Sequence, residues 1–145
     1  MKSFYLLLIT TFLFSPISGE KFSSVRVKGT MLCHGKPAQY VELQLVNDRI
    51  WPLSNIVMAR NVFTDPNGEF EIAGYDHRSG IDARLYVWHR CFPRKTEQKD
   101  PCFNWFEIEI PGVHVQDEVL SEKAWTLGDV KLEVPREGGK LILCD

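Results

Sequence analysis

The chain has 145 residues, with 17 Lys and Arg against 19 Asp and Glu and a formal net charge of −2. This balance excludes a nonspecific nucleic-acid binder, which needs many cations to neutralise phosphates. Beyond the amino terminus the sequence has no long apolar stretch, so we expect no membrane span in the mature chain.

The amino terminus has the order of a secretory signal peptide. Residues 1–2 give a short positive start, residues 4–14 are uncharged and almost wholly apolar, and the small residues Ser18 and Gly19 follow. The apolar run of about 11 residues is shorter than the roughly 20 that a transmembrane helix needs. We expect cleavage after Gly19, which removes one lysine and changes the net charge from −2 to −3. The mature protein is therefore expected to be secreted and extracellular.

Six runs alternate apolar and polar residues, a pattern typical of half-buried strands. In chain order they lie at 25–32, 40–46, 68–74, 84–89, 106–112 and 129–134, and a run with weaker alternation lies at 55–63. One apolar face is expected to collect Val25, Val27, Met31, Val41, Leu43, Leu45, Phe70, Ile72, Leu85, Val87, Phe106, Ile108, Ile110, Val130, Leu132 and Val134.

Turn residues separate these runs, and helix signals are scarce. The sharpest turn is "DPNG" at 65–68, where Pro66 presets φ and Gly68 tolerates positive φ, so we expect a tight hairpin there. Short strands with frequent turns predict an all-β antiparallel sandwich of seven or eight strands over residues 20–134. Residues 135–145 are expected to be a flexible tail with a short apolar anchor.

The mature part carries four cysteines: Cys33, Cys91, Cys102 and Cys144. An even number behind a signal peptide predicts two disulfides. Among the three pairings we favour Cys91–Cys102, because it closes a short ring worth on the order of 3 kcal/mol, and this leaves Cys33–Cys144. The alternative is a zinc site that uses His89 with Cys91, or His34 with Cys33. Its spacing lacks a C-x2-C knuckle, so we expect no metal and no cofactor.

Several motifs together resemble the nematode transthyretin-like family. They are "VRVKGTMLCHGKPAQYVELQL", "TDPNGEFEIAG", "RLYVWHRC" with a later "PCFNWFEIEIP", and "LGDVKLE", and they cover nearly the whole mature chain. The residues that carry the resemblance are Gly29, Leu32, Cys33, Gly35, Lys36, Pro37, Thr64, Asp65, Gly68, Phe70, Gly74, His89, Cys91, Cys102, Gly128 and Leu132. The resemblance implies a secreted prealbumin-like β-sandwich with an extracellular binding role toward a small hydrophobic molecule, a lipid or a cell surface.

An enzymatic role is not expected. A related branch of the transthyretin fold hydrolyses 5-hydroxyisourate with histidines, an arginine and a carboxy-terminal Tyr-Arg-Gly-Ser, whereas this sequence ends in "LILCD". His89 follows Leu85 and Val87 in phase, so it is expected to be a hydrogen-bonded core residue. We expect a non-catalytic binding protein; the alternatives are an interaction module without a small ligand and, more distantly, a hydroxyisourate-hydrolase-like enzyme.

Two surface features are candidate binding sites. Tyr86 and Trp88 point away from the apolar face of their strand and are expected to form an outer aromatic patch, unless the carboxy-terminal tail covers them. The second feature is the loop that runs to Trp105. It carries the cations Arg90, Arg94, Lys95 and Lys99, and is either a contact for anionic lipid or a solvated rim.

The loop hypothesis predicts the behaviour of a variant with Arg94, Lys95 and Lys99 all changed to glutamate. We expect it to fold normally, because all three are placed in solvent, and to lose sedimentation with phosphatidylserine vesicles. Parent binding should weaken with salt, since the screening length falls to roughly 8 Å at physiological ionic strength. Unchanged binding by the variant, or no binding by the parent at low salt, would leave the loop as a solvated rim.

Overall fold

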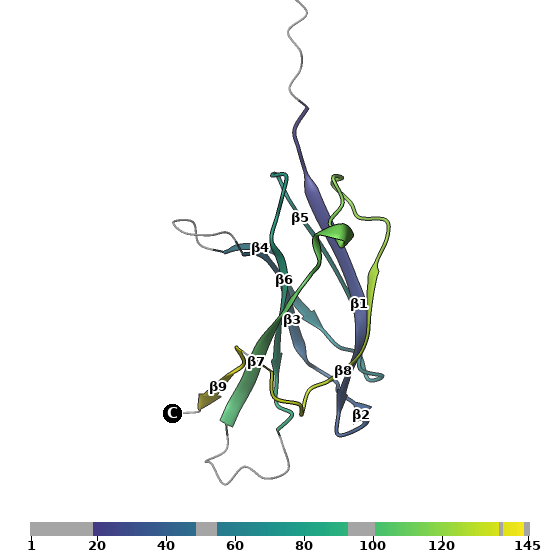
Figure 1. Ribbon diagram of the computed structural model, residues 1–145. Helices are drawn as coiled ribbons and strands as arrows, with labels where there is room; N and C mark the ends of the chain where they lie inside the picture. The colour runs from purple at the N-terminus through teal and green to yellow at the C-terminus, as the bar shows by residue number, and fades with distance from the viewer. Residues whose placement is uncertain (1–18, 49–54, 93–100, 137, 144–145) are drawn as a thin grey trace, which may run out of the picture.

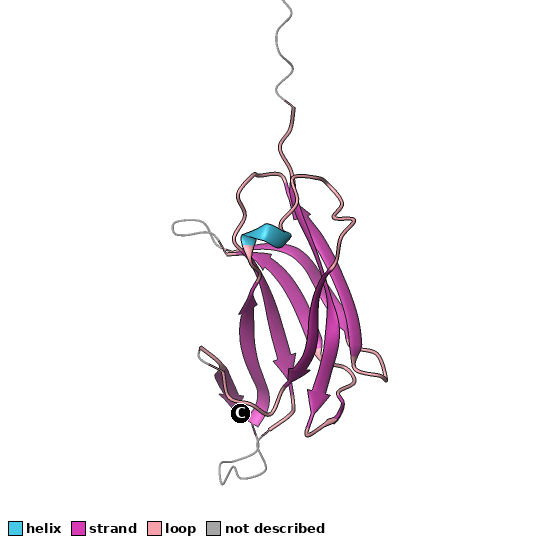
Figure 2. Cartoon of the chain, turned by 45° about the vertical axis from the view of Figure 1, so that its right-hand side comes forward, coloured by secondary structure: helices cyan, strands magenta, loops and turns pink. Residues whose placement is uncertain are grey.

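The strands form two sheets packed face to face in a computed structural model that describes residues 19–48, 55–92, 101–136 and 138–143 (Figures 1 and 2). In the first sheet the central strand β1 (Ser23–Cys33) pairs with β2 (Lys36–Pro37), β5 (Glu69–Asp76) and β8 (Trp125–Lys131). The second sheet has the order β4-β3-β6-β7-β9, made of β4 (Ile56–Phe63), β3 (Glu42–Asn47), β6 (Ala83–His89), β7 (Pro101–Glu109) and β9 (Lys140–Leu143). A short 3-10 helix, η1 (Gly112–His114), follows β7. The predicted all-β sandwich is therefore confirmed.

The alternating pattern places one face of each sheet in a shared core. Of the sixteen residues predicted to face it, fourteen are buried, and Ile108 packs against the core while partly buried. Each large apolar side chain buried in this way stabilises the fold by about 1.5–3 kcal/mol. The prediction was wrong for Val134, which is 49% exposed, because β8 ends at Lys131 and the chain then leaves the sheet.

The weak run at 55–63 forms strand β4, and its poor alternation has a structural cause. The pairing of β4 with β3 shifts register on either side of Leu45. Each shift moves the following side chains to the other face, so the two-residue period is interrupted. At this edge β4 also lies close to β5: a side chain at Gly74 would meet the Met58 backbone at 2.9 Å. The interruption therefore lies where the two sheets come together.

Strand β8 pairs with β1 in parallel, whereas the other described ladders are antiparallel. Residues 110–124, which include η1, carry the chain from β7 in the second sheet across the upper end of the sandwich in Figure 2 to β8, which lies beside β1 in the first sheet. Periodicity predicts a strand but not its partner or its direction, so this pair was not predictable from the alternation of Val130 and Leu132.

The turn at 65–68 is tight, but the hairpin prediction was wrong. Gly68 N–H donates to the Asp65 carbonyl at 2.9 Å, and Asp65 N–H donates to the Glu69 carbonyl at 3.0 Å. The strands on either side belong to different sheets, because β4 pairs with β3 and β5 pairs with β1. Thr64 directs the crossing: its buried hydroxyl accepts from Val41 N–H at 3.0 Å and donates to the Ala38 carbonyl at 2.6 Å.

Gly68 is required at this turn for two reasons. Its φ is +74°, a backbone conformation that residues with a side chain rarely adopt. In addition, an added Cβ would lie 2.4 Å from the Met31 carbonyl oxygen. The Met31 N–H in turn donates to the Gly68 carbonyl at 2.8 Å. The turn is thus held directly against β1, the central strand of the first sheet.

Part of the expected tail is a strand. Residues Lys140–Leu143 form β9, which pairs antiparallel with β7 at the edge of the second sheet, as Figure 1 shows.

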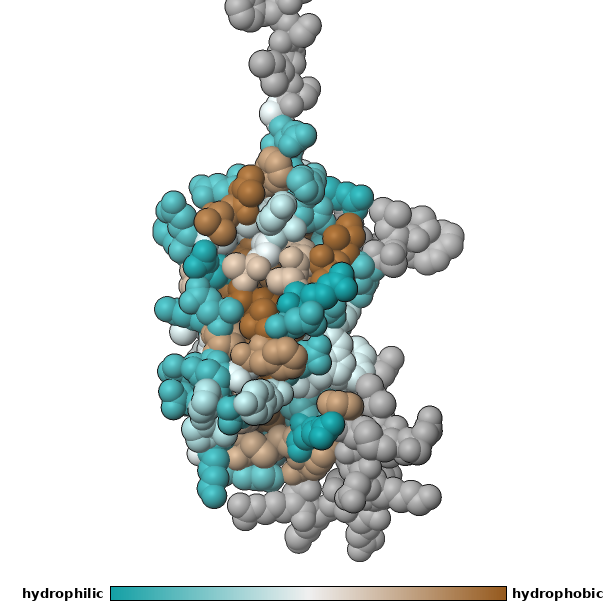
Figure 3. All heavy atoms as spheres, turned by 180° about the vertical axis from the view of Figure 1, so that it is seen from behind, coloured by the Kyte–Doolittle hydropathy of each residue, from teal (hydrophilic) through white to brown (hydrophobic). Residues whose placement is uncertain are grey.

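The surface of the molecule, seen from behind, carries hydrophobic residues (brown) in an interrupted band between hydrophilic ones (Figure 3). Within the described residues, no helix is long and apolar enough to cross a membrane.

The cysteine pairing predicted from chain economy was wrong. Cys33 at the end of β1 is joined to Cys91 just after β6, with an S–S distance of 2.06 Å and Cα atoms 5.7 Å apart. Cys91 therefore does not pair with Cys102, nor Cys33 with Cys144. The reason is tertiary: Cys91 continues the inward phase of His89, and the core-facing ends of β1 and β6 meet across the sandwich. The disulfide thus links the two sheets.

Non-reducing peptide mapping is expected to recover a Cys33–Cys91 peptide. Pro101 lies opposite Leu143 in the β7–β9 register, so we expect the remaining cysteines, Cys102 and Cys144, to form the second link. Replacing Cys33 and Cys91 together by alanine should lower the free energy of unfolding by about 4 kcal/mol, because the bond spans 58 residues. Urea unfolding measures this loss; recovery of a Cys91–Cys102 peptide would contradict the pairing.

Candidate functional site

A pocket of about 520 Å³ lies beside the Cys33–Cys91 disulfide, at one end of the sandwich. Its wall combines apolar and aromatic side chains from both sheets with a few polar groups. It is lined by Cys33, Ala38, Gln39, Tyr40, Val41, Glu42, Phe63, Trp88, His89, Arg90, Cys91, Phe103 and Leu132. This volume falls in the range of small-molecule sites, which span about 300–1,000 Å³ and are mostly apolar.

The rim of the pocket holds two aromatic rings in solvent. Tyr40 has φ of +60° and is 75% exposed, and Phe63 at the end of β4 is 50% exposed. The backbone that carries Tyr40 is fixed, because its N–H donates to the Thr64 carbonyl at 3.1 Å. The turn motif around Thr64 therefore positions the pocket rim as well as the crossing between sheets.

His89 lies in the pocket wall and is only 3% exposed, so its predicted inward orientation is confirmed. The Cys91 N–H donates to its Nδ1 at 3.1 Å, which leaves the proton of the neutral ring on Nε2. Nε2 is buried and has no hydrogen-bond partner among the described residues. Burial lowers the pKa of His89 from 6.5 to about 4, and the bond that Nδ1 accepts also favours the neutral ring. The imidazole is therefore neutral at physiological pH.

Three of the four residues named in the zinc alternatives come together, without His89, and two of the three are cysteines bonded to each other. Potential ligand atoms of Cys33, His34 and Cys91 lie within 4.8 Å of one another. The two sulfurs are bonded to each other, and zinc needs thiolates. His34 Nε2 lies 2.8 Å from the Phe92 carbonyl, so this ring has a structural role beside the disulfide.

Tyr86, Trp88 and Trp105 form an aromatic cluster on the outer face of the second sheet. Ring centroids are 5.8 Å apart for Tyr86–Trp88, 5.5 Å for Tyr86–Trp105 and 6.4 Å for Trp88–Trp105. All three side chains are half-buried. The cluster arises from register, because Trp88 lies directly opposite Trp105 and Tyr86 lies two residues before Trp88. Strand β9, which belongs to the expected carboxy-terminal tail, pairs with the edge of β7.

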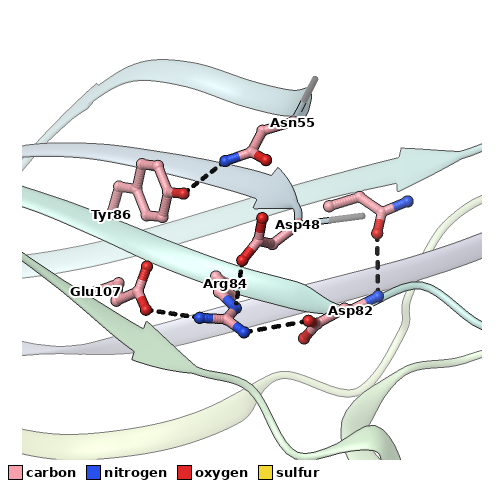
Figure 4. A network of polar contacts seen from close by, with 7 residues as sticks. Asp48, Asn55, Asp82, Arg84, Tyr86 and Glu107 are labelled. Carbon is pink, nitrogen blue, oxygen red and sulfur yellow. Dashed lines mark hydrogen bonds and ion pairs between the residues drawn. The ribbon is translucent and has the colours of Figure 1, made fainter. Parts of the chain in front are cut away.

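A charged network borders this cluster (Figure 4). The Arg84 guanidinium lies 2.6 Å from Glu107, 3.0 Å from Asp48 and 3.2 Å from Asp82, and Asn55 donates to the Tyr86 hydroxyl at 2.7 Å. Burial opposes the charge of Arg84, but the three carboxylates outweigh it and raise its pKa. Burial, followed by Asp48 and Glu107, raises the pKa of Tyr86. Three acids around one base leave this region negative.

The cationic loop is described only at its base. Arg90 lies over the Phe103 ring, with 4.7 Å from its guanidinium carbon to the ring centroid, and the disulfide fixes Cys91 next to it. Arg94, Lys95 and Lys99 lie outside the described residues. Trp105, which we grouped with this loop in the sequence, belongs instead to the outer aromatic cluster.

Two functional features were missed in the sequence. The pocket joins residues from strands far apart in the chain, such as Val41, Phe63 and Leu132, and no local pattern predicts that. The Arg84 network carried a signal: Arg84 and Glu107 each occupy the outward phase of a predicted strand, where a cross-strand ion pair is common. The register of the two strands was needed to show that these two side chains are neighbours.

The buried neutral His89 predicts acid sensitivity. Its folded pKa of about 4 lies below the unfolded 6.5, so only the unfolded state gains a proton as pH falls between these values. The free energy of unfolding should therefore decrease from pH 6.5 to pH 4 by about 2 kcal/mol, once solvent screening is allowed for. Urea unfolding at both pH values measures it. His89→Gln should flatten this dependence and His77→Gln, at an exposed position, should not; equal profiles would contradict the assignment.

Comparison with known proteins identifies relatives of the whole sandwich. Residues 28–111 match the model of the transthyretin-like family. Among curated proteins of Caenorhabditis elegans, Transthyretin-like protein 5 is 31% identical over 118 residues, which cover 79% of this chain and 81% of that protein. Transthyretin-like protein 46 is 26% identical over 134 residues, which cover 92% of this chain and 72% of that protein. Transthyretin-like protein 2 is 27% identical over 114 residues, which cover 75% of this chain and 74% of that protein.

A solved structure of a 9R-lipoxygenase from Cyanothece aligns over 75% of this chain and 16% of its own length, with 19% identity and a TM-score of 0.42. This similarity is too distant to bear on fold or function. The family match covers more than half of the sequence and agrees with the two-sheet sandwich: this chain belongs to the transthyretin-like family.

Proposed function

We propose that this protein is a secreted, non-catalytic extracellular binding protein that takes a small hydrophobic ligand in the pocket beside the Cys33–Cys91 disulfide. The observation that carries the proposal is the pocket itself, about 520 Å³ with a largely apolar and aromatic wall. Family membership supports the fold on which the pocket is built. The ligand itself is proposed from the pocket alone.

The chemistry of the wall favours an apolar ligand with one polar end. Val41 and Leu132 are buried in the wall, and Phe63 at the rim leaves half of its ring in water. An apolar molecule that covers this exposed ring gains about 25 cal/mol per Å² removed from water. The neutral His89 adds no charge to the wall, whereas Glu42 and Arg90 offer polar contacts at its edge.

The amino-terminal pattern and the disulfide together support secretion. A cross-link between two sheets persists in oxidising compartments, and residues 1–19 have the order of a cleaved signal peptide. We propose as the organisation of the chain this leader, the sandwich at 20–134 and a tail at 135–145 that contributes β9 to the second sheet. The absence of enzymatic activity is part of the proposal, since His89 is buried and pairs with backbone.

A hydrophobic fluorescent probe, 8-anilinonaphthalene-1-sulfonate, tests the pocket. We expect saturable binding at one site per chain. Phe63→Asp should weaken this binding by roughly fivefold, because it removes apolar contact and places a charge at the rim. Phe63 is half-exposed, so the variant should keep its fold, and circular dichroism checks this.

Leu120→Asp is the matched control, since Leu120 is 62% exposed and lies outside the pocket. It should bind the probe as the parent does. Binding that does not saturate, or equal weakening by both variants, would contradict the pocket and favour an interaction module without a small ligand. Turnover of 5-hydroxyisourate by the purified protein would contradict the non-catalytic role.

A further inference from the structure

We infer that the outer aromatic cluster, Tyr86, Trp88 and Trp105, is a second binding site, and that its ligand is an organic cation bearing a quaternary ammonium group. The proposal adds a charged ligand class on the sheet face to the hydrophobic pocket at the sandwich end. The two sites adjoin at Trp88, which also lines the pocket. The variants below therefore change residues outside the pocket.

The first observation is the spacing of the three rings. Their centroids form a triangle with sides of 5.5, 5.8 and 6.4 Å. The centre of such a triangle is about 3.4 Å from each corner, so a cation about 3.5 Å above it lies roughly 5 Å from all three rings. This distance is within the roughly 6 Å over which a ring face attracts a cation, and tryptophan is the strongest of the aromatic partners. The ring planes are inclined to one another by 74° for Tyr86–Trp88, 49° for Tyr86–Trp105 and 27° for Trp88–Trp105.

The second observation is the charge around the rings. Register places Glu42 opposite Trp88 and Glu107 opposite Tyr86, while Lys140 lies opposite Trp105. Asp48 and Asp82 are held beside them through Arg84. Among the described residues named here, four carboxylates against two basic residues give a negative charge, which complements a cationic ligand. Of these acids, Asp48 and Glu107 help to raise the pKa of Tyr86.

The third observation selects the kind of cation. Asp48, Asp82 and Glu107 each contact Arg84 through one oxygen, and the faces of the three rings offer no conventional hydrogen-bond acceptor to a cation above them. A primary ammonium ion loses water on binding and needs hydrogen-bond acceptors in return. A quaternary ammonium has no N–H donors and is attracted by ring faces and by charge at a distance. The arrangement therefore favours a choline-type group over an alkyl ammonium.

Titration of the full mature protein with choline, followed by nuclear magnetic resonance, tests the site. We expect the indole N–H signals of Trp88 and Trp105 to shift saturably and that of Trp125, on the other sheet, to stay unchanged. The neutral analogue 3,3-dimethylbutan-1-ol has the shape of choline without the charge and should bind at least about tenfold more weakly. Methylammonium should also bind more weakly than tetramethylammonium. Equal binding of choline and its neutral analogue would overturn the proposal, as would preference for methylammonium.

Paired variants separate the rings from the charges. Tyr86→Phe keeps the ring and should keep choline affinity, whereas Tyr86→Leu should lower it by about fivefold. Glu107→Gln should lower it by about three- to tenfold, and Glu71→Gln, which removes a similar Arg-paired acid on the first sheet, should not. If Glu107→Gln and Glu71→Gln act equally, or if Tyr86→Leu binds choline as the parent does, the site is not the cluster.

Two further measurements keep this result separate from the hydrophobic pocket and identify the source of the ligand. Glu107→Gln should bind 8-anilinonaphthalene-1-sulfonate as the parent does. Loss of choline binding at the cluster can therefore be told apart from loss of probe binding in the pocket. Sedimentation with phosphatidylcholine vesicles, competed by tetramethylammonium, would place the cation on a lipid headgroup. Choline binding without sedimentation would place it on a soluble molecule.

Discussion

The bond between Cys33 and Cys91 is the constraint on which the binding end of the molecule depends. It joins the last residue of β1 to the chain just beyond β6 and so closes the two sheets on each other. His89, two residues before Cys91, is held by the Cys91 backbone and keeps a neutral ring in the wall. The pocket exists because both sheets end at this cross-link and leave the rings of Tyr40 and Phe63 at its rim.

The turn after β4 is the second fixed point of the same end. Thr64 ties the crossing strand to Ala38 and Val41, and Gly68 lies against the Met31 carbonyl where a side chain would collide. These contacts tie the turn to β1 and to the segment that precedes β3. The resemblance motifs "TDPNGEFEIAG" and "RLYVWHRC" thus include residues that shape one end of the sandwich.

The two proposed sites lie on neighbouring surfaces and would bind their ligands through different interactions. The pocket offers apolar contact beside a neutral histidine, whereas the outer face combines three rings with an excess of carboxylates around Arg84. Trp88 belongs to both, so a ligand with an apolar part and a cationic end can be considered at the boundary. The cationic loop beyond Arg90 would add a third kind of binding surface, with positive charge. The vesicle experiment on this loop is independent of both sites.

The sequence by itself determined the all-β class, the inward phase of residues such as Leu85 and Ile72, the tight turn at Gly68 and the family. These depend on a two-residue period and on local backbone conformation, which neighbouring residues carry. Only the tertiary structure decided the Cys33–Cys91 pairing, the parallel β1–β8 pair and the crossing at Thr64. It also decided the meeting of Trp105 with Tyr86 and the pocket. Each depends on which strands become neighbours and in which register, and periodicity is the same for every choice of neighbour.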